Sequence, residues 1–293
     1  MHGLIPFLKP PGMTSHDAVN FARRALGTKR VGHAGTLDPA AAGVLPLAVG
    51  EATRLLQWMP GGKSYVAEAS FGYETTTLDA MGETVSRCDA SQVSAEKIAA
   101  ILPRFVGSFD QIPPLYSAIK TDGKKGYERA RDGEDVELAA RRVEVFSLQL
   151  TRFENGETPR ARFDIACGAG FYVRSLVRDI GRQLGCGATM TFLVRSQSSG
   201  FALEKAATVE ELEAGNPHSS FVSFDTALDS CATTHIEDDA LIGLYLAGKG
   251  AWREQAHAKA QSETLLVRSP SRGAALLWRG ESEISTFFWQ PKS

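Results

Sequence analysis

A single carboxylate, Asp38, stands in an otherwise uncharged stretch near the N-terminus. Residues 31–50 read VGHAGTLDPAAAGVLPLAVG, and the other polar side chains there are His33 and Thr36. Glycines surround Asp38 and Pro39 follows it, which predicts a rigid, tightly turned loop whose backbone a ligand can approach closely. Two interpretations stay open at this point. Asp38 is either an ionised group kept for chemistry or an Asx-turn residue before proline.

The residues around Asp38 in the sequence limit the reactions in which it could take part. No second carboxylate lies nearby in the sequence, so the paired acids of glycosidases are not indicated. His33 has no partner at metal-ligand spacing. The four cysteines form no C-x-x-C pair: Cys88, Cys167, Cys186 and Cys231. We therefore expect no metal and no cofactor, and the scattered cysteines are typical of reduced thiols in the cytoplasm.

Two further stretches carry side chains that could act with Asp38. Lys63 and Tyr65 open the alternating run KSYVAEA, where a tyrosine is more often core packing than a catalytic group. In GAGFYVRSLVRD, Arg174 falls in the first turn of a predicted helix, where a cation opposes the helix dipole. That position indicates a specific carboxylate partner. The alternative is a solvated face of arginines.

The stretch IPPLYSAIKTDGKKGYERARDGEDVE, from residue 112, is rich in glycine and basic residues with tyrosines between them. Such a composition suits an arm that closes on a nucleic-acid backbone. On composition alone, a solvated surface hairpin is the better interpretation. The overall net charge of −2 neither requires nor excludes a nucleic-acid partner.

The remaining sequence predicts the elements that would position these groups. Apolar residues at helical spacing predict a helix from Thr14 to Gly27. Further helices are expected over 51–59, 94–105, 171–185, 208–213 and 238–246, and strands over 65–71, 143–153, 161–167, 265–269 and 273–278. This irregular mixture favours an α+β fold over a doubly wound sheet.

Composition supports an ordinary globular chain with a change of texture near its end. The 293 residues are 43% hydrophobic and 23% charged, and no apolar run has the length of a signal peptide or membrane span. GNPHSS at 215–220 is a plausible linker, so we expect domains at 1–215 and 221–293, with the arm at about 113–137. Residues 206–293 carry 7 Lys and Arg against 12 Asp and Glu.

Five blocks in one order give the chain a specific resemblance. They are KPPGMTS, GHAGTLDPAAAGVLP, KSYVAEASFG, PPLYSAIKTDGKKGYERAR and GFYVRSLVRDIG, spread over about the first two hundred residues. In this order and spacing the chain resembles the TruB family, the bacterial tRNA pseudouridine-55 synthases. Ala40 and Ala42 depart from the family, which usually has Leu and Thr there, and both look like packing changes.

The resemblance implies a fold and a reaction. The fold is a pseudouridine-synthase catalytic domain, with a mixed, mainly antiparallel sheet and flanking helices, plus a small C-terminal PUA-like β-barrel. The reaction detaches the T-loop uridine's base from ribose, turns it and rejoins it through carbon. It needs no cofactor. The partner would be the T arm of tRNA, bound by a cytoplasmic monomer without membrane or metal.

The resemblance also implies roles for residues. Asp38 would be the essential carboxylate, Arg174 its ion-pair partner, and Tyr65 a stacking group and candidate acid or base. His33 would brace the flipped nucleotide, although a core histidine is the alternative, while Tyr172 and Leu193 would wall the uracil site. The basic residues expected at the substrate are Lys9, Lys63, Lys120, Lys124, Lys125 and Arg129.

Other functions stay open beside this one. A tRNA-binding folding factor could use the same groove with catalysis secondary, although a pure binder has no need of Asp38, Tyr65 and Arg174 together. A glycosidic hydrolase is weaker, because the second carboxylate and metal ligands are missing. The sequence does not decide whether Asp38 attacks C1′, adds to the uracil ring or promotes a glycal-type elimination. We favour elimination assisted by Tyr65.

Overall fold

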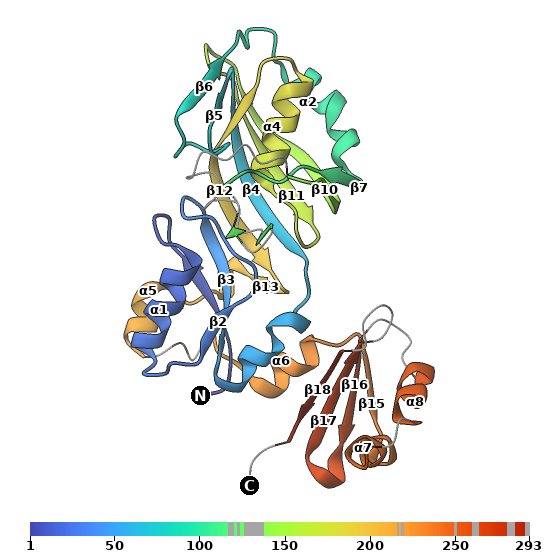
Figure 1. The fold of residues 1–293 in the computed structure, drawn as a ribbon. Helices are drawn as coiled ribbons and strands as arrows, with labels where there is room; N and C mark the ends of the chain where they lie inside the picture. The colour runs from blue at the N-terminus through green and yellow to red at the C-terminus, as the bar shows by residue number, and fades with distance from the viewer. Residues whose placement is uncertain are drawn as a thin grey trace. The chain divides into compact units, whose positions relative to one another are not determined.

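The computed structural model describes residues 1–116, 120–121, 124–125, 138–215, 217, 220–248, 251–259, 264–279 and 285–290 (Figure 1). The chain divides into two compact units. The larger one comprises Ile5–Leu47 and Gly61–Ser220, and the smaller one Met1–Leu4, Ala48–Pro60 and Phe221–Ser293. Within the described ranges, no helix has both the length and the apolar character needed to span a membrane.

A mixed, mainly antiparallel sheet forms the centre of the larger unit. Its strands follow the spatial order β1 (Gly3–Lys9), β3 (Ala42–Val49), β12 (Ala188–Ser198), β4 (Lys63–Phe71), β11 (Arg160–Cys167), β10 (Arg141–Glu154) and β7 (Gly107–Gln111). β12 pairs in parallel with β3 and antiparallel with β4. The β4–β11, β11–β10 and β10–β7 pairs are also antiparallel. The α+β prediction is confirmed.

Short strands extend this sheet, and four others form separate two-stranded hairpins. β2 (Val31–His33) pairs with β3, and β13 (Phe201–Ala202) pairs with β12. β5 (Tyr73–Thr75) and β6 (Thr84–Arg87) form a separate hairpin, and β8 (Lys120–Thr121) pairs with β9 (Lys124–Lys125). The loops that end β2 and link β5 to β6 contribute to the site described below.

The helices of the larger unit lie within the ranges expected from the sequence. They are α1 (Ser15–Ala25), α2 (Ala95–Ile101) with a 3-10 turn over Leu102–Phe105, α4 (Val173–Gln183) and α5 (Val209–Glu213), with another 3-10 turn over Leu203–Lys205. Thr14 caps α1 and Thr208 caps α5, each in a capping box. α4 packs its apolar stripe along β12, with α2 close by (Figure 1).

The smaller unit contains a second sheet with its own core. β14 (Val222–Ser223) pairs with Gly3 and Leu4, and α6 (Phe224–Ser230) follows it. Gly50–Trp58 forms a 3-10 helix where the sequence predicted an ordinary helix. The second sheet has the order β15 (Thr234–Glu237), β16 (Thr264–Ser269), β17 (Ala274–Arg279) and β18 (Ser285–Trp289), with a 3-10 turn over Pro270–Arg272.

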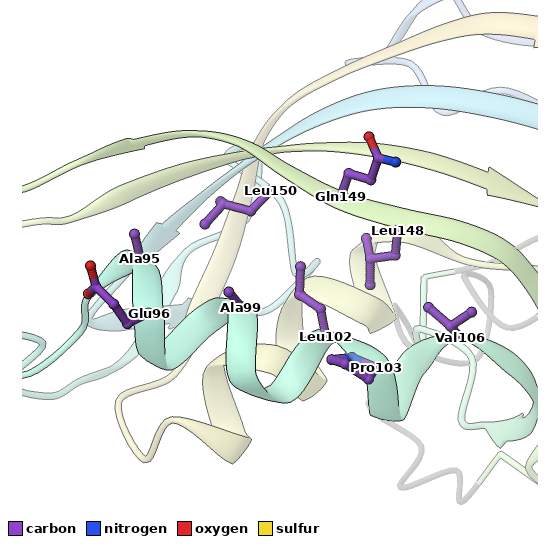
Figure 2. Close-up of a pocket in the computed structure, with 9 residues that line it drawn as sticks. All are labelled: Ala95, Glu96, Ala99, Leu102, Pro103, Val106, Leu148, Gln149 and Leu150. Carbon is purple, nitrogen blue, oxygen red and sulfur yellow. The ribbon is translucent and has the colours of Figure 1, made fainter.

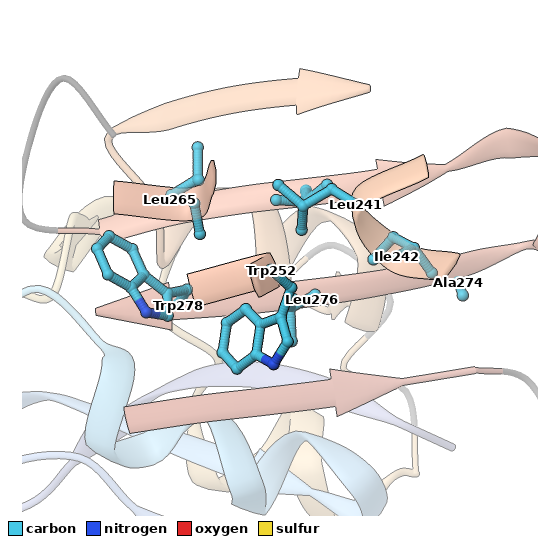
Figure 3. Close-up of a cluster of buried hydrophobic side chains, with 9 residues drawn as sticks. Leu241, Ile242, Trp252, Leu265, Ala274, Leu276 and Trp278 are labelled. Atoms are coloured by element: carbon cyan, nitrogen blue, oxygen red, sulfur yellow. The ribbon is translucent and has the colours of Figure 1, made fainter. Parts of the chain in front are cut away.

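Two helices cover one face of this second sheet. α7 (Asp239–Leu246) and α8 (Ala251–Lys259) bring Leu241, Ile242 and Trp252 against strand residues such as Leu265 and Trp278, and all five are buried (Figure 3). β15 and β18 stand at the two edges, so the described strands form an open sheet and no closed barrel. The strands predicted at 265–269 and 273–278 are present as β16 and β17.

Candidate active site

The loop that carries Asp38 connects β2 to β3 and is closed by its own backbone. Gly35 has a φ of 71°, in the left-handed region that favours glycine. The Ala41 amide donates to the Asp38 carbonyl at 3.1 Å, and the Gly12 amide donates to the Pro39 carbonyl at 2.8 Å. Among the described residues no backbone amide binds the Asp38 carboxylate. An Asx turn is therefore not what this structure contains.

The Asp38 carboxylate faces the guanidinium of Arg174. Nε of Arg174 lies 2.8 Å from Oδ2 of Asp38, and Nη2 donates to Oδ1 at 3.0 Å. The arginine side chain is only 5% exposed, whereas that of the aspartate is 29% exposed. A buried planar fork that meets both carboxylate oxygens fixes the orientation of the carboxylate, and the more open aspartate remains reachable by a ligand.

Arg174 also holds two neighbouring loops. Nη1 donates to the Thr77 carbonyl at 2.9 Å, and Nη2 donates to the Tyr116 carbonyl at 3.0 Å. Asp79 places Oδ2 at 3.8 Å from Nη1 of Arg174, and its Oδ1 accepts from the Thr77 hydroxyl. One arginine in the first turn of α4 thereby joins the Asp38 loop, the β5–β6 loop and the chain at Tyr116.

Tyr65 lies near the start of β4 and is almost fully buried. Burial raises the pKa of its hydroxyl to about 12, and the charge and side-chain hydrogen bond of Arg195 oppose this rise. At neutral pH the hydroxyl therefore keeps its proton. In this environment Tyr65 is a hydrogen-bond donor, and it would have to lose that proton before it could serve as a base.

Asp38, Tyr65 and Arg174 line one small cavity of about 90 Å³. Tyr172 and Leu193, which the family resemblance implies for the uracil site, line the same cavity. The remaining lining residues are Thr36, Leu37, Phe171 and Val173. One carboxylate, one arginine and one phenol thus meet beside the apolar side chains of Leu37, Phe171, Val173 and Leu193, and charge interactions in such a partly buried site are stronger than in water.

A larger groove of about 880 Å³ lies elsewhere in the larger unit and has a different character. It runs between α2 and β10, where Leu102 and Leu148 face each other (Figure 2). Glu96 is the ionisable residue among those lining it. None of the residues predicted to take part in chemistry lines this groove, so size alone does not locate the candidate site.

Lys9 is buried beneath the Asp38 loop. Its Nζ donates to the carbonyls of Met13 at 2.7 Å, Pro10 at 2.8 Å and Pro39 at 3.4 Å. The side chain is fully buried, and burial lowers its pKa to about 8. Lys9 therefore braces the turn that follows Asp38, and its assignment to substrate binding stays a prediction.

His33 and Lys63 flank the same loop from β2 and β4. Burial lowers the pKa of His33, so the neutral imidazole is favoured, and its buried Nδ1 has no hydrogen-bond partner in the described part of the chain. Lys63 donates to the Gly61 carbonyl at 3.1 Å, and burial lowers its pKa as well. The charge of Arg195 contributes to both decreases.

The expected arm is only partly within the described chain. Lys120, Lys124 and Lys125 lie on the β8–β9 ladder, where Lys120 pairs with Lys125. Arg129 lies outside the described residues. At the base of the arm, Gln111 exchanges two hydrogen bonds with the Tyr172 backbone, at 2.9 and 3.1 Å. The chain that enters the arm is thereby fixed to the start of α4.

Arg195 is fully buried between β3 and β4. It lies on β12, and its direct cross-strand neighbours are Tyr65 on β4 and Gly43 on β3. Its guanidinium donates to three carbonyls of the Asp38 loop and the strand after it: Val44 at 2.8 Å, Gly35 at 3.0 Å and Thr36 at 3.3 Å.

Comparison with known protein families shows which family this chain belongs to. The model of the TruB family pseudouridylate synthase N-terminal domain matches residues 23–173, which is more than half of the chain. The model of the tRNA pseudouridylate synthase B C-terminal domain matches residues 174–230. The chain belongs to the TruB family. The match to the first model includes Asp38 and Tyr65, and Arg174 is the first residue matched by the second.

Individual relatives agree with this membership. A tRNA pseudouridine synthase B of Symbiobacterium thermophilum is 51% identical over 73% of this chain and 72% of its own length. Its counterpart in Trichormus variabilis is 48% identical over 73% of each chain. Among solved structures, one described as a Cbf5-Nop10-Gar1 complex contains a chain with a TM-score of 0.67 and 25% identity, covering 99% of this chain and 84% of that one.

Two buried residues of this TruB-family site were missed in the sequence. Asp79 is a lone acid in the threonine- and glycine-rich stretch TTTLDAMG, the same kind of signal that pointed to Asp38. Arg195 follows Leu193 at a spacing of two, which places both on one face of a strand. An arginine on the face of a pocket residue is a signal that the sequence analysis did not use.

Proposed function

We propose that this chain is a tRNA pseudouridine-55 synthase, an isomerase that converts the T-loop uridine of tRNA to pseudouridine. The observation that carries the proposal is the Asp38–Arg174 pair, set at a small cavity that Tyr65, Tyr172 and Leu193 also line, in a chain of the TruB family. The binding-only alternative is not favoured, because binding RNA does not require a carboxylate held this way.

The reaction breaks the bond between ribose C1′ and uracil N1, turns the base and joins C1′ to uracil C5. The hydrogen on C5 leaves as a proton and N1 gains one, so the product is an isomer of the substrate and no redox cofactor is needed. The Asp38 carboxylate is the group we assign to attack at C1′ or to removal of the C2′ proton in a glycal route. Arg174 would fix its orientation.

Tyr65 would act at the same atoms as a protonated group. Because burial raises its pKa to about 12, its hydroxyl can donate a hydrogen bond to the sugar or the detached base. The elimination favoured above would then use Asp38 to accept the C2′ proton, with Tyr65 assisting as a donor. Tyr172 and Leu193 would retain the detached uracil while it turns, because their cavity has little room for other molecules.

A T-loop uridine is stacked, so it must flip out to reach this cavity. We assign His33 to the flipped nucleotide, since its neutral ring carries an Nδ1 with no partner in the described structure. Lys63 would lie beside the same nucleotide. Phosphate contacts would come from the arm at about 113–137, through Lys120, Lys124, Lys125 and Arg129.

The proposal extends to the rest of the chain. Residues 1–215 would form the catalytic domain, and residues 221–293 a PUA-like domain, for which the β-rich second sheet is the support. The acidic balance of the C-terminal part gives it little attraction for phosphates, so the larger unit would supply most of the RNA contact. We further propose a monomeric enzyme that works in the cytoplasm on newly made tRNA.

The direct test is to map the product. Unmodified tRNA transcript is incubated with the protein, and pseudouridine is located by carbodiimide modification and primer extension. The expected result is one new pseudouridine at position 55 and none in a control transcript that carries cytidine there. Pseudouridine at another position would replace the proposed substrate site, and no pseudouridine in any transcript would overturn the proposed activity.

A further inference from the structure

Arg195 is an unusual residue for the place it occupies. Its side chain is fully buried, yet it forms no ion pair with any described residue, and it donates to three backbone carbonyls. Taking an arginine out of water without a carboxylate is unfavourable for folding. A methionine or leucine would fill a strand core without that penalty, so the guanidinium calls for an explanation beyond packing.

The contacts of Arg195 all lead to the proposed active site. Two of its three carbonyl acceptors, Gly35 and Thr36, lie shortly before Asp38 in the loop, and the third, Val44, lies in β3, the strand that follows. Gly43 is packed so closely on β12 that an added Cβ would lie 2.2 Å from the Arg195 carbonyl oxygen. Arg195 thus holds both ends of the Asp38 loop against β12.

The other side of Arg195 faces Tyr65. The two residues are direct partners across the β12–β4 pair, and the guanidinium acts on the hydroxyl through its charge and a side-chain hydrogen bond. The same charge acts on Lys9, His33 and Lys63. One buried cation therefore lies between the loop that presents Asp38 and the strand that presents Tyr65, and it contacts both.

We propose that Arg195 is a positioning residue for the isomerisation, which sets the Asp38 loop and the Tyr65 hydroxyl in a fixed relation across the substrate cavity. This inference rests on the function proposed above. A guanidinium suits the task because its donors diverge in one plane and can meet three carbonyls and a hydroxyl together. A lysine keeps the charge but has a single ammonium, so it cannot hold all four groups at their present positions.

The test compares Arg195→Lys with a matched control, Arg23→Lys. Arg23 is a half-buried arginine on α1 that also donates to a backbone carbonyl, that of Val31 at 3.2 Å, and it lines no part of the cavity. Each variant is assayed for single-turnover tritium release from tRNA labelled at uracil C5, for tRNA binding at equilibrium, and for thermal unfolding by circular dichroism. The assays run at a temperature at which each variant is folded.

We expect the Arg195→Lys rate to fall by about 10- to 100-fold, because small displacements of reacting groups reduce rates on this scale. Its tRNA affinity should change by less than about threefold, and Arg23→Lys should match the wild type in both. An unchanged rate overturns the inference. So does a loss confined to binding, or an Arg195→Lys variant that folds at no temperature, since each would make Arg195 a residue of binding or of folding alone. A wild type without tritium release would refute the proposed function instead.

Discussion

Replacing Arg174 with lysine tests whether this arginine, at the start of α4, is as important for stability and activity as its contacts indicate. The side chain is 5% exposed, contacts both oxygens of Asp38 and donates to the carbonyls of Thr77 and Tyr116. Lysine keeps the charge but offers one ammonium in place of the planar fork. We therefore count the loss of two charge-assisted hydrogen bonds, at about 1.5 kcal/mol each, or about 3 kcal/mol of unfolding free energy.

The same helix supplies the control. Arg182 pairs with Glu74 at 3.2 Å, but its side chain is 60% exposed. Water screens such a surface pair, so Arg182→Lys should change the unfolding free energy by less than about 1 kcal/mol. Urea unfolding followed by circular dichroism measures both variants, and tritium release from labelled tRNA measures their activity.

The expected outcome is a clear separation of the two variants. Arg174→Lys should lose about 3 kcal/mol and most of its activity, because the Asp38 carboxylate and the Tyr116 segment lose their common anchor. Arg182→Lys should resemble the wild type in both respects. If the two variants lose equal stability, or if Arg174→Lys keeps full activity, the reasoning from the buried fork is wrong.

Three other predictions follow from the same contacts. Burial lowers the pKa of His33, so on acidification the unfolded chain binds a proton at this histidine before the folded chain does, and stability should fall as the pH drops below about 6.5. The urea midpoint of His33→Gln should fall less over the same pH range than that of the wild type. Equal decreases in the two midpoints would contradict this prediction. Burial raises the pKa of Cys167 to about 12, whereas Cys88 is exposed, so iodoacetamide should label Cys88 before Cys167. Mass spectrometry of timed samples measures the order, and labelling of Cys167 before Cys88 would refute the prediction. Replacing the three arm lysines of β8 and β9 with alanine should weaken tRNA binding and flatten its salt dependence without changing the rate of bound substrate; an unchanged salt slope would remove the arm from the phosphate contacts.

Local chemistry made much of the larger unit predictable. The helix start at Thr14 and the apolar stripe of residues 173–184 depend on neighbours three or four positions apart, and the structure contains both helices. The placement of Arg174 was also readable, because a cation in the first turn of a helix needs a nearby anion. The family resemblance, and not spacing, selected Asp38 as that partner.

Residues whose roles depend on distant strands were not predictable in this way. Lys9 ends a short strand, and nothing in KPPG reveals that its ammonium meets the Pro39 carbonyl. Arg195 depends on β12 lying between β3 and β4, an order that brings together segments more than a hundred residues apart. The expected C-terminal barrel is an open sheet in the described residues, with β15 and β18 at its edges. Whether two edge strands pair to close a barrel depends on the whole sheet, and the pairing of neighbours such as β15 and β16 does not determine it.

The central claim is that the Asp38 carboxylate performs the chemistry, and Asp38→Asn tests it most directly because the substitution keeps the shape and removes the charge. The measurement is tritium release from a tRNA transcript labelled at uracil C5, with tRNA binding measured in parallel. We expect release by the wild type and none by the variant, with binding intact in both. Equal release by the two proteins would contradict it.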